Sequence, residues 1–404
     1  MTIMNFWKLS HTICSTSASL ALLFTIGLQI SFTSIQAQDN DLPSLHKAYE
    51  DAFLIGTALN RAQIFADDSA ATEQVLRADR RGYFYRQQII TDPKGLELAR
   101  THFNSVTPEN VMKWEEIHPK PDVYDFEAAD RFVDFAEAHE MFIVAHTLVW
   151  HNQTPDWVFE DEDGNDLSRE ALLERMRDHI HTIVGRYKGR IHAWDVVNEA
   201  LNEDGSMRES RWQQIIGDDY IQKAFEFAHE ADPDAGLYYN DYAMESPSKR
   251  AGAIRLVEEL LDKGVPVSGI GSQSHFGLHS PEIEQVEKSI NDLASLGIDV
   301  MITELDINVL PSARKNGELN SESNIYPEEL PGEVQEELTR RYQDLFRIYL
   351  DHKDVINRVT MWGVADGGSW LNYLPMERVN YPLLFDRENK AKPALKALID
   401  LTNN

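Results

Sequence analysis

The sequence predicts an α/β fold, a single (β/α)8 TIM barrel, and three observations support this prediction. The chain has 404 residues, of which 42% are hydrophobic, so it can bury the large core that such a barrel needs. Strand-like and helix-like stretches alternate along it eight times from Phe53 onward. Several strand-like stretches are near-continuous apolar runs, which is typical of strands buried on both faces of a parallel sheet.

The eight predicted strands are short and apolar, and the helices between them have apolar residues at spacings of three and four. The strands span residues 53–60, 105–109, 141–150, 191–199, 236–242, 269–276, 300–305 and 358–364. The predicted helices include residues 126–140, a helix with Ser168 as its N-cap, 247–263, 333–349 and 392–401. A doubly wound open sheet is the structural alternative, but no glycine-rich phosphate loop follows the first strand.

Two connections are long, and both follow strand ends, where barrel loops line the active face. Residues 61–91 contain a polar, helix-like piece at 69–80 and then the aromatic run Tyr83-Phe84-Tyr85. Residues 311–331 are rich in Pro, Asn, Ser and Glu. We expect the aromatic run either to extend a substrate cleft, because sugar faces stack on such rings, or to attach the loop to the barrel.

Residues 1–37 have the pattern of a signal peptide, and the remaining residues 38–404 are predicted to form one domain. Lys8 precedes an apolar segment from Ala18 to Phe32, and no acidic residue occurs in the first 38 positions. Small residues allow cleavage after Ala37. Ser, Thr and Gln interrupt the apolar run, which disfavours a membrane anchor. We therefore expect a secreted or periplasmic protein.

The charge and the cysteine content restrict the partners. The formal charge of −29 becomes −30 when Lys8 is removed with the signal segment. Such a surface repels nucleic-acid phosphates and anionic membranes, whereas a neutral polysaccharide is indifferent to it. This excess of acid fits a salt-tolerant protein and an ordinary soluble surface equally well. The single cysteine of the sequence, Cys14, lies in the segment to be removed, so no disulfide is needed. We expect a monomer without a cofactor.

Polar and aromatic residues concentrate at the carboxyl ends of the predicted strands. They are Glu109, Asn110 and Lys113 after the second strand, His146, Trp150, His151 and Gln153 at the third, Asn198 and Glu199 at the fourth, Tyr239-Asn-Asp-Tyr242 at the fifth, Gln273 and His275 at the sixth, Glu304 and Asp306 at the seventh, and Trp362 and Trp370 at the eighth. Each one alone is more often a helix cap or ordinary packing. Because parallel strand ends converge on one face of a barrel, the whole set predicts an active site.

A metal centre is not expected there. His146 and His151 are the two residues that suggest one, but a spacing of five along a strand places them on opposite faces.

Seven motifs resemble those of glycoside hydrolase family 10, the retaining endo-β-1,4-xylanases, and the resemblance covers residues 53–401. The motifs are Asn104-Ser-Val-Thr-Pro-Glu-Asn110, His146–His151, Trp194–Ala200, Tyr239–Tyr242, Gly271–His275, Ile302–Asp306 and Trp362-Gly-Val-Ala-Asp366. The resemblance implies a barrel that cleaves xylan and xylo-oligosaccharides. It further implies that Glu199 is the acid/base, that Glu304 is the nucleophile and that Asn198 holds the sugar 2-hydroxyl.

The resemblance also implies roles for the neighbouring residues. His275, between Glu304 and Asp306, would orient the nucleophile, and Tyr242 would face the leaving group. Glycone contacts are implied for Glu109, Asn110, Lys113, His146, Trp150, Gln153, Gln273, Trp362 and Trp370. The sequence departs from the family at Ala243, where many relatives have Asn, and in residues 65–90, a longer first loop than usual.

The chemistry requires two carboxyls about 5–5.5 Å apart, one ionised and one protonated. Repulsion at that distance is roughly 3 kcal/mol at an effective dielectric constant near 20, or about two pKa units, so the first carboxylate keeps the proton on the second. Alternatives are a cellulase or mixed β-glycanase, a non-catalytic xylan-binding barrel and a metal-dependent barrel hydrolase. Two carboxyl-tipped strands argue against the second of these, and the absence of ligand spacing argues against the third.

Overall fold

The computed structural model describes residues 43–67, 73–78, 84–89 and 91–402. The predicted signal peptide, residues 1–37, and Tyr83 of the aromatic run lie outside these residues. Within the described part of the chain, no helix is both long enough and apolar enough to span a membrane.

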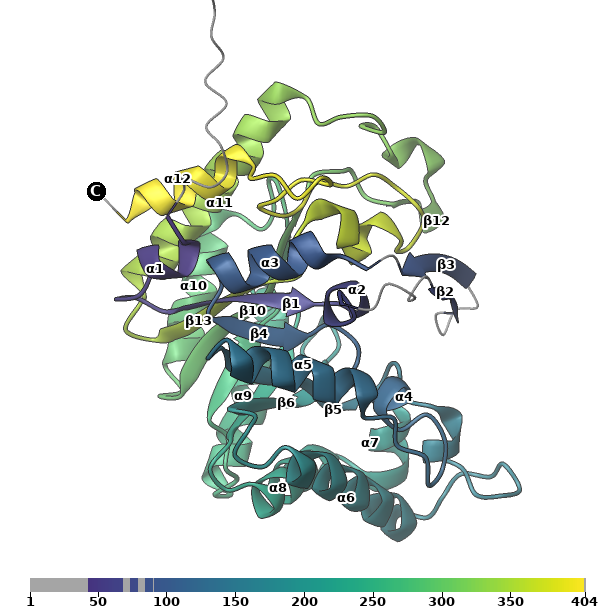
Figure 1. Ribbon diagram of the computed structural model, residues 1–404. Coiled ribbons are helices and arrows are strands. Elements are labelled where there is room, and N and C mark those ends of the chain that lie inside the picture. Colours follow the sequence, from purple (N-terminus) through teal and green to yellow (C-terminus); the bar gives the residue numbers. More distant parts are fainter. Residues whose placement is uncertain (1–42, 68–72, 79–83, 90, 403–404) are drawn as a thin grey trace, which may run out of the picture. The chain divides into compact units, whose positions relative to one another are not determined.

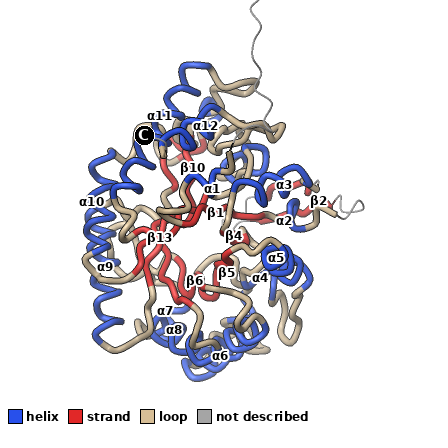
Figure 2. Tube along the Cα trace, turned by 60° about the vertical axis from the view of Figure 1, so that its left-hand side comes forward, coloured by secondary structure: helices blue, strands red, loops and turns tan. Residues whose placement is uncertain are grey.

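Eight parallel strands form a closed barrel, as the sequence predicts. Their order follows the chain, and the last strand pairs with the first, with Leu54 opposite Arg358 and Thr57 opposite Met361. The strands are β1 (Leu54–Leu59), β4 (Ser105–Pro108), β5 (Phe142–Trp150), β6 (Ala193–Asn198), β7 (Gly236–Asp241), β8 (Gly269–Ser272), β10 (Asp299–Asn308) and β13 (Ile356–Met361). Figures 1 and 2 show these strands surrounded by helices. The barrel therefore presents all eight carboxyl ends on one face.

The helices cover the outside of the barrel. They are α1 (Leu45–Ala48), α2 (Arg61–Ile64), α3 (Pro93–His102), α4 (Trp114–Ile117), α5 (Glu127–Ala138), α6 (Arg169–Arg186), α7 (Arg211–Ile216), α8 (Tyr220–Ala231), α9 (Pro247–Asp262), α10 (Ile283–Ala294), α11 (Gly332–Asp351) and α12 (Pro393–Leu401). The predicted N-cap Ser168 accepts a hydrogen bond from the backbone N–H of Ala171, which satisfies a donor that the first turn leaves free. Proline begins α3, α9 and α12, where its missing N–H costs nothing.

Two hydrophobic clusters hold the fold together. The large cluster lies between strands and helices and includes Phe132, Trp194, Phe225, Leu345 and Leu395, all buried. The small one lies in the barrel interior and comprises Val144, Ala193, Tyr238 and Met301. The interior also contains polar side chains, because the buried Arg358 lies close to Tyr238 and to Asp195.

Two predicted elements are wrong in detail. The helix-like piece at 69–80 is instead strand β2 (Glu73–Ala78), which pairs antiparallel with β3 (Phe84–Ile89). Antiparallel pairing with this neighbouring strand overrides the weak helical preference of the stretch. The strand predicted at 269–276 is broken, because Ser274 has a φ of 58°, and residues His275–Gly277 form a separate strand, β9, which pairs with β10.

The long connection at 311–331 has little regular structure. It contains a two-residue antiparallel pair, β11 (Arg314–Lys315) with β12 (Glu318–Leu319), and a 3-10 helix, η3 (Ser321–Ser323). Further 3-10 helices are η2 (Asp156–Val158), η4 (Asp366–Gly368) and η5 (Trp370–Asn372). The last two shape the loop that follows β13.

Candidate active site

A cleft of about 1090 Å³ lies at the carboxyl ends of the strands. Fourteen of the fifteen predicted site residues line it, namely Glu109, Asn110, Lys113, His146, Trp150, Gln153, Asn198, Glu199, Tyr242, Gln273, His275, Glu304, Trp362 and Trp370. The exception is Asp306, which lies behind His275. The structure therefore brings together the residues that the strand ends predicted.

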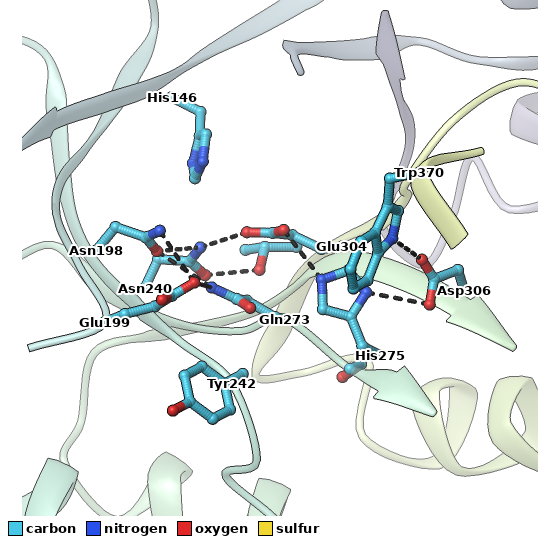
Figure 3. A network of polar contacts seen from close by, with 12 residues as sticks. His146, Asn198, Glu199, Asn240, Tyr242, Gln273, His275, Glu304, Asp306 and Trp370 are labelled. Carbon is cyan, nitrogen blue, oxygen red and sulfur yellow. Dashed lines mark hydrogen bonds and ion pairs between the residues drawn. The ribbon is translucent and has the colours of Figure 1, made fainter. Parts of the chain in front are cut away.

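Glu304, near the middle of β10, is buried and held by a chain of polar contacts (Figure 3). His275 Nε2 lies 3.2 Å from Glu304 Oε2, and its Nδ1 lies 3.1 Å from Asp306 Oδ1. Trp370 Nε1 donates to Asp306 Oδ2 at 2.8 Å. The imidazole is thus fixed between two carboxylates, and the indole fixes the second of them.

These contacts set the charges at Glu304. Burial disfavours the imidazolium form of His275, but the Asp306 and Glu304 carboxylates outweigh it and raise the pKa of His275 to about 10. Burial would raise the pKa of Glu304, but the hydrogen bond from His275, together with His146 and Lys113, lowers it below its usual value. Glu304 is therefore an ionised carboxylate beside a cation, which suits a nucleophile.

Glu199, one residue past the end of β6, is half-buried and faces the same cleft. Trp150 Nε1 donates to its Oε2 at 3.0 Å, and Gln273 Nε2 donates to its Oε1 at 3.1 Å. The backbone of Glu199 has a φ of 57°, a left-handed conformation that is uncommon for residues other than glycine. Such strain is found mainly where the surrounding structure fixes a functional side chain.

Asn240 links the two carboxyls, and the sequence analysis named it only as part of the run from Tyr239 to Tyr242, without a role. Its Nδ2 donates to Glu304 Oε1 at 2.7 Å and to Asn198 Oδ1 at 3.1 Å, while its Oδ1 accepts from Thr303 Oγ1 at 2.6 Å. Gly271 leaves room for it, since a Cβ there would lie 2.4 Å from Asn240 Oδ1. The position of Asn240, two residues before Tyr242 in a strand-end motif, was the available signal.

Asn198 completes this network. Its Oδ1 accepts from Asn240 and from Gln273 Nε2 at 3.2 Å, which orients its amide group. Glu199 and Glu304 are therefore joined through the side chains of Gln273, Asn198 and Asn240 (Figure 3).

A second cluster of donors and acceptors lies along the cleft. Lys113 Nζ donates to Asn110 Oδ1 at 3.0 Å and to Gln153 Oε1 at 3.1 Å, and it lies 4.8 Å from the centre of the Trp150 ring. His146 Nδ1 lies 2.9 Å from Asp195 Oδ2, a buried carboxylate that the sequence reasoning also missed. Because Asp195 holds Nδ1, Nε2 is the nitrogen of His146 left to act elsewhere.

Aromatic rings form the walls of the cleft. Trp362 packs edge-on against His146 and His275, at centroid distances of 5.4 and 6.3 Å. Figure 3 shows Tyr242 on the far side of Glu199 and Gln273 from His146. Ala243 follows it with a φ of 54° and lines the cleft without a polar group.

Two carboxyls joined by one network, in a cleft of donors and aromatic rings at the carboxyl face of a (β/α)8 barrel, define a barrel glycoside hydrolase. The family model described as "Glycosyl hydrolase family 10" matches residues 44–401. The chain belongs to glycosyl hydrolase family 10.

Individual relatives agree with this family. The chain is 42% identical over 387 residues to endo-1,4-beta-xylanase A from Xylanibacter ruminicola, with 94% of this chain and 98% of that protein covered. Among solved structures, it is 45% identical, with a TM-score of 0.81, to an endoxylanase of the family from a sugarcane soil metagenome, covering 89% of this chain and 100% of that one. It is 36% identical, with a TM-score of 0.74, to a mutant xylanase from Thermoanaerobacterium saccharolyticum in complex with xylotetraose, covering 89% and 99%.

Proposed function

We propose that this protein is an endo-1,4-β-xylanase that hydrolyses internal bonds of xylan with retention of configuration. The observation that carries the proposal is the pair Glu199 and Glu304, joined by one hydrogen-bond network within the cleft. The named activity of the relatives supports the choice of xylan and xylo-oligosaccharides as substrate.

In the first step, the Glu304 carboxylate attacks the anomeric carbon while Glu199 gives its proton to the glycosidic oxygen. A glycosyl ester forms on Glu304, and the leaving sugar departs with the proton of Glu199. His275 keeps Glu304 ionised, since it lowers the pKa of this carboxyl. Asp306 and Trp370 hold the imidazole in the orientation that this requires.

In the second step, Glu199 accepts a proton from water, which attacks the anomeric carbon and releases Glu304. The ester carries no negative charge, so Glu304 no longer repels a negative charge on Glu199. Glu199 can therefore act as a base in this step after acting as an acid in the first. Two inversions give net retention.

Binding of the polymer is divided between the two ends of the cleft. We assign Glu109, Asn110, Lys113 and Gln153 to hydroxyl groups of the glycone, and Asn198 to the 2-hydroxyl at the reacting centre. These amide, amine and carboxylate groups line the cleft and take no part in the two bond-breaking steps, so they are available to bind sugar hydroxyls. Tyr242, beyond Glu199, is assigned to the leaving-group side.

The aromatic walls favour a pentose. Trp362 and Trp370 would press on flat sugar faces, and an indole above C5 would crowd the hydroxymethyl group that glucose carries and xylose lacks. We therefore expect xylan to be preferred over cellulose.

We also propose that residues 1–37 are removed and that the mature enzyme is a secreted or periplasmic monomer. The apolar segment, the lack of acid and the small residues before Gln38 support the first proposal. Amino-terminal sequencing of protein exported by a bacterial host should begin at Gln38, and light scattering should give one chain per particle.

The test of the proposed function compares the oligosaccharides released from glucuronoxylan with those released from carboxymethyl-cellulose. We expect a series of short xylo-oligosaccharides from the first and little release from the second. Proton NMR of early products should show the β anomer before mutarotation. Equal release from both polymers would indicate a broad β-glycanase, and an initial α anomer would exclude double displacement.

A further inference from the structure

Lys249 is a buried charge that the proposed mechanism does not use. It lies in the first turn of α9, and its side chain is 0% exposed. Lysine is almost never fully buried unless it is paired, and a cation in the first turn of a helix opposes the helix dipole. Its Nζ lies 2.6 Å from Oδ1 of Asp241, which is also 0% exposed. The position is unfavourable for a cation, so the residues around the pair must stabilise it there.

The ring of Tyr242 covers the same ammonium group. Lys249 Nζ lies 3.3 Å from the ring centroid, which is direct cation–π contact, and contacts of this kind are strongest where water is excluded. Tyr242 is half-buried and lines the catalytic cleft. The lysine therefore lies behind a ring that forms part of the cleft wall.

Asp241 and Arg208 fix the rest of this tyrosine. The backbone N–H of Tyr242 donates to Asp241 Oδ1 at 2.9 Å, and Tyr239 holds Oδ2 of the same carboxylate at 2.6 Å. Arg208 Nη2 donates to the Tyr242 hydroxyl at 3.0 Å, and Arg208 Nε donates to the backbone oxygen of Glu199 at 3.0 Å. The position of the ring is thereby linked to the segment that carries Glu199.

The alternation of side chains along β7 explains how this strand end contacts both the catalytic carboxyl Glu304 and the buried Lys249. Asn240 and Asp241 are consecutive at the end of β7, so their side chains point to opposite faces. Asn240 points inward and contacts Glu304, whereas Asp241 points toward α9 and contacts Lys249.

We propose that Lys249 is a positioning residue for substrate recognition on the leaving-group side. It holds the Tyr242 ring in the orientation that stacks on the first sugar beyond the cleaved bond. This inference rests on the proposed function, because it assumes that a sugar chain occupies the cleft on both sides of Glu199.

The test removes the cation without leaving a buried carboxylate unpaired. The double variant Lys249→Met/Asp241→Asn replaces both charges with neutral groups of similar size. The matched control is Lys392→Met/Asp366→Asn, which removes a second buried pair, with Nζ 3.0 Å from Oδ2, whose members do not line the cleft. Tyr242→Ala is the reference for complete loss of the ring.

The readout is the ratio of kcat/KM for xylotetraose to kcat/KM for β-xylobiosyl fluoride. Both substrates fill the glycone side, but the fluoride has no sugar on the leaving-group side. A general loss of stability would lower both values and leave their ratio unchanged. We expect the ratio to fall about tenfold in Tyr242→Ala and in the Lys249 double variant, within the range of a desolvated cation–π contact, and to stay within about twofold of wild type in the control.

The outcomes separate this proposal from the function on which it rests. A wild-type protein that hydrolyses neither substrate would refute the proposed function. An active wild type whose ratio is unchanged in the Lys249 double variant, or in Tyr242→Ala, would overturn the positioning role.

If the double variant does not fold, the single variant Lys249→Met replaces it, and both kcat/KM values are measured at pH 5. Burial already raises the pKa of Asp241 to about 6 even though Lys249 lowers it, so without Lys249 this carboxyl is protonated and neutral at that pH.

Discussion

His275 Nε2 lies 3.2 Å from Glu304 Oε2, so an imidazolium is in contact with the carboxylate at the centre of the cleft. The same imidazole contacts Asp306 on its other side. One cation therefore faces two carboxylates, and its pKa is raised to about 10. This arrangement favours the ionised form of Glu304, whose pKa lies below its usual value.

Replacing Glu304 with Gln should lower the rate of hydrolysis of both xylan and activated aryl xylobiosides by roughly 10⁴-fold or more. Even a good leaving group cannot compensate for a missing nucleophile. Turnover of dinitrophenyl β-xylobioside, followed by absorbance, measures this. Glu287→Gln, a change of the same kind on the outer helix α10, should leave the rate unchanged. Appreciable turnover by the Glu304 variant would remove Glu304 from the mechanism.

Replacing His275 with Gln should shift the acid limb of the pH profile upward. His275 lowers the pKa of Glu304, so loss of the cation raises that pKa and Glu304 becomes protonated at a higher pH. The profile of kcat/KM for the aryl substrate measures the shift. The exposed His139, changed to Gln, is the control. An acid limb at the wild-type position would show that His275 does not set the charge of Glu304.

Glu199→Ala should separate the two steps. A dinitrophenyl leaving group needs no protonation, so glycosylation should survive while deglycosylation slows, and a burst of dinitrophenol should precede a slow steady state. Azide needs no general base, so it should raise the steady-state rate by roughly 10²-fold and yield β-xylobiosyl azide. If azide has no effect and both steps slow equally, Glu199 is not the acid/base.

A histidine pair should make the fold sensitive to acid. His118 Nδ1 lies 3.1 Å from His179 Nδ1, both residues are buried, and the His179 ring stacks on Trp114 at 3.4 Å. Burial lowers the pKa of His118 to about 4 and that of His179 well below its usual value. The unfolded chain therefore binds protons first, so the stability is complete above pH 6.5 and decreases as the pH falls toward 4.

Urea unfolding between pH 6.5 and pH 5 measures this effect. Over that interval the free energy of unfolding should fall by roughly 3 kcal/mol more in wild type than in His118→Phe/His179→Phe, which replaces both partners with rings. His139→Gln is again the exposed control. Equal slopes in wild type and the double variant would show that this pair does not titrate on unfolding.

Much of the site could be predicted from the sequence because the barrel brings consecutive strand ends to one face. Glu199 and Glu304 each follow an apolar run, and strand order alone places them on the same face. Asn240 could have been found in the same way, because it lies at the carboxyl end of β7, next to Asp241. Neighbouring side chains in a strand point to opposite faces, and that of Asn240 points inward to Glu304.

Other features depend on contacts that sequence patterns do not encode. Lys249 reads as a surface residue of a helix, and its burial is decided by where α9 packs on the end of β7. Residues 73–78 read as helical, and their strand conformation comes from pairing with 84–89. The predicted stacking role of the aromatic run at Tyr83 falls outside the described residues and stays a prediction.

Ala243 offers a test of both stability and binding. Its φ of 54° is a left-handed conformation that costs alanine roughly 1–2 kcal/mol, whereas Asn adopts it more readily. Ala243→Asn should therefore raise the free energy of unfolding by about 1 kcal/mol, measured by urea denaturation. Ala251→Asn, at an exposed position inside α9, should have the opposite sign because Asn is the poorer helix former.

The same variant should affect the leaving-group side. Ala243 is exposed, lines the cleft and directly follows Tyr242, so an amide there can reach a sugar hydroxyl. We expect KM for xylotetraose to fall about threefold, the gain of one modest hydrogen bond, while kcat/KM for β-xylobiosyl fluoride stays unchanged. A stabilised protein with an unchanged KM would mean that the backbone conformation, and not a sugar contact, favours asparagine at this position.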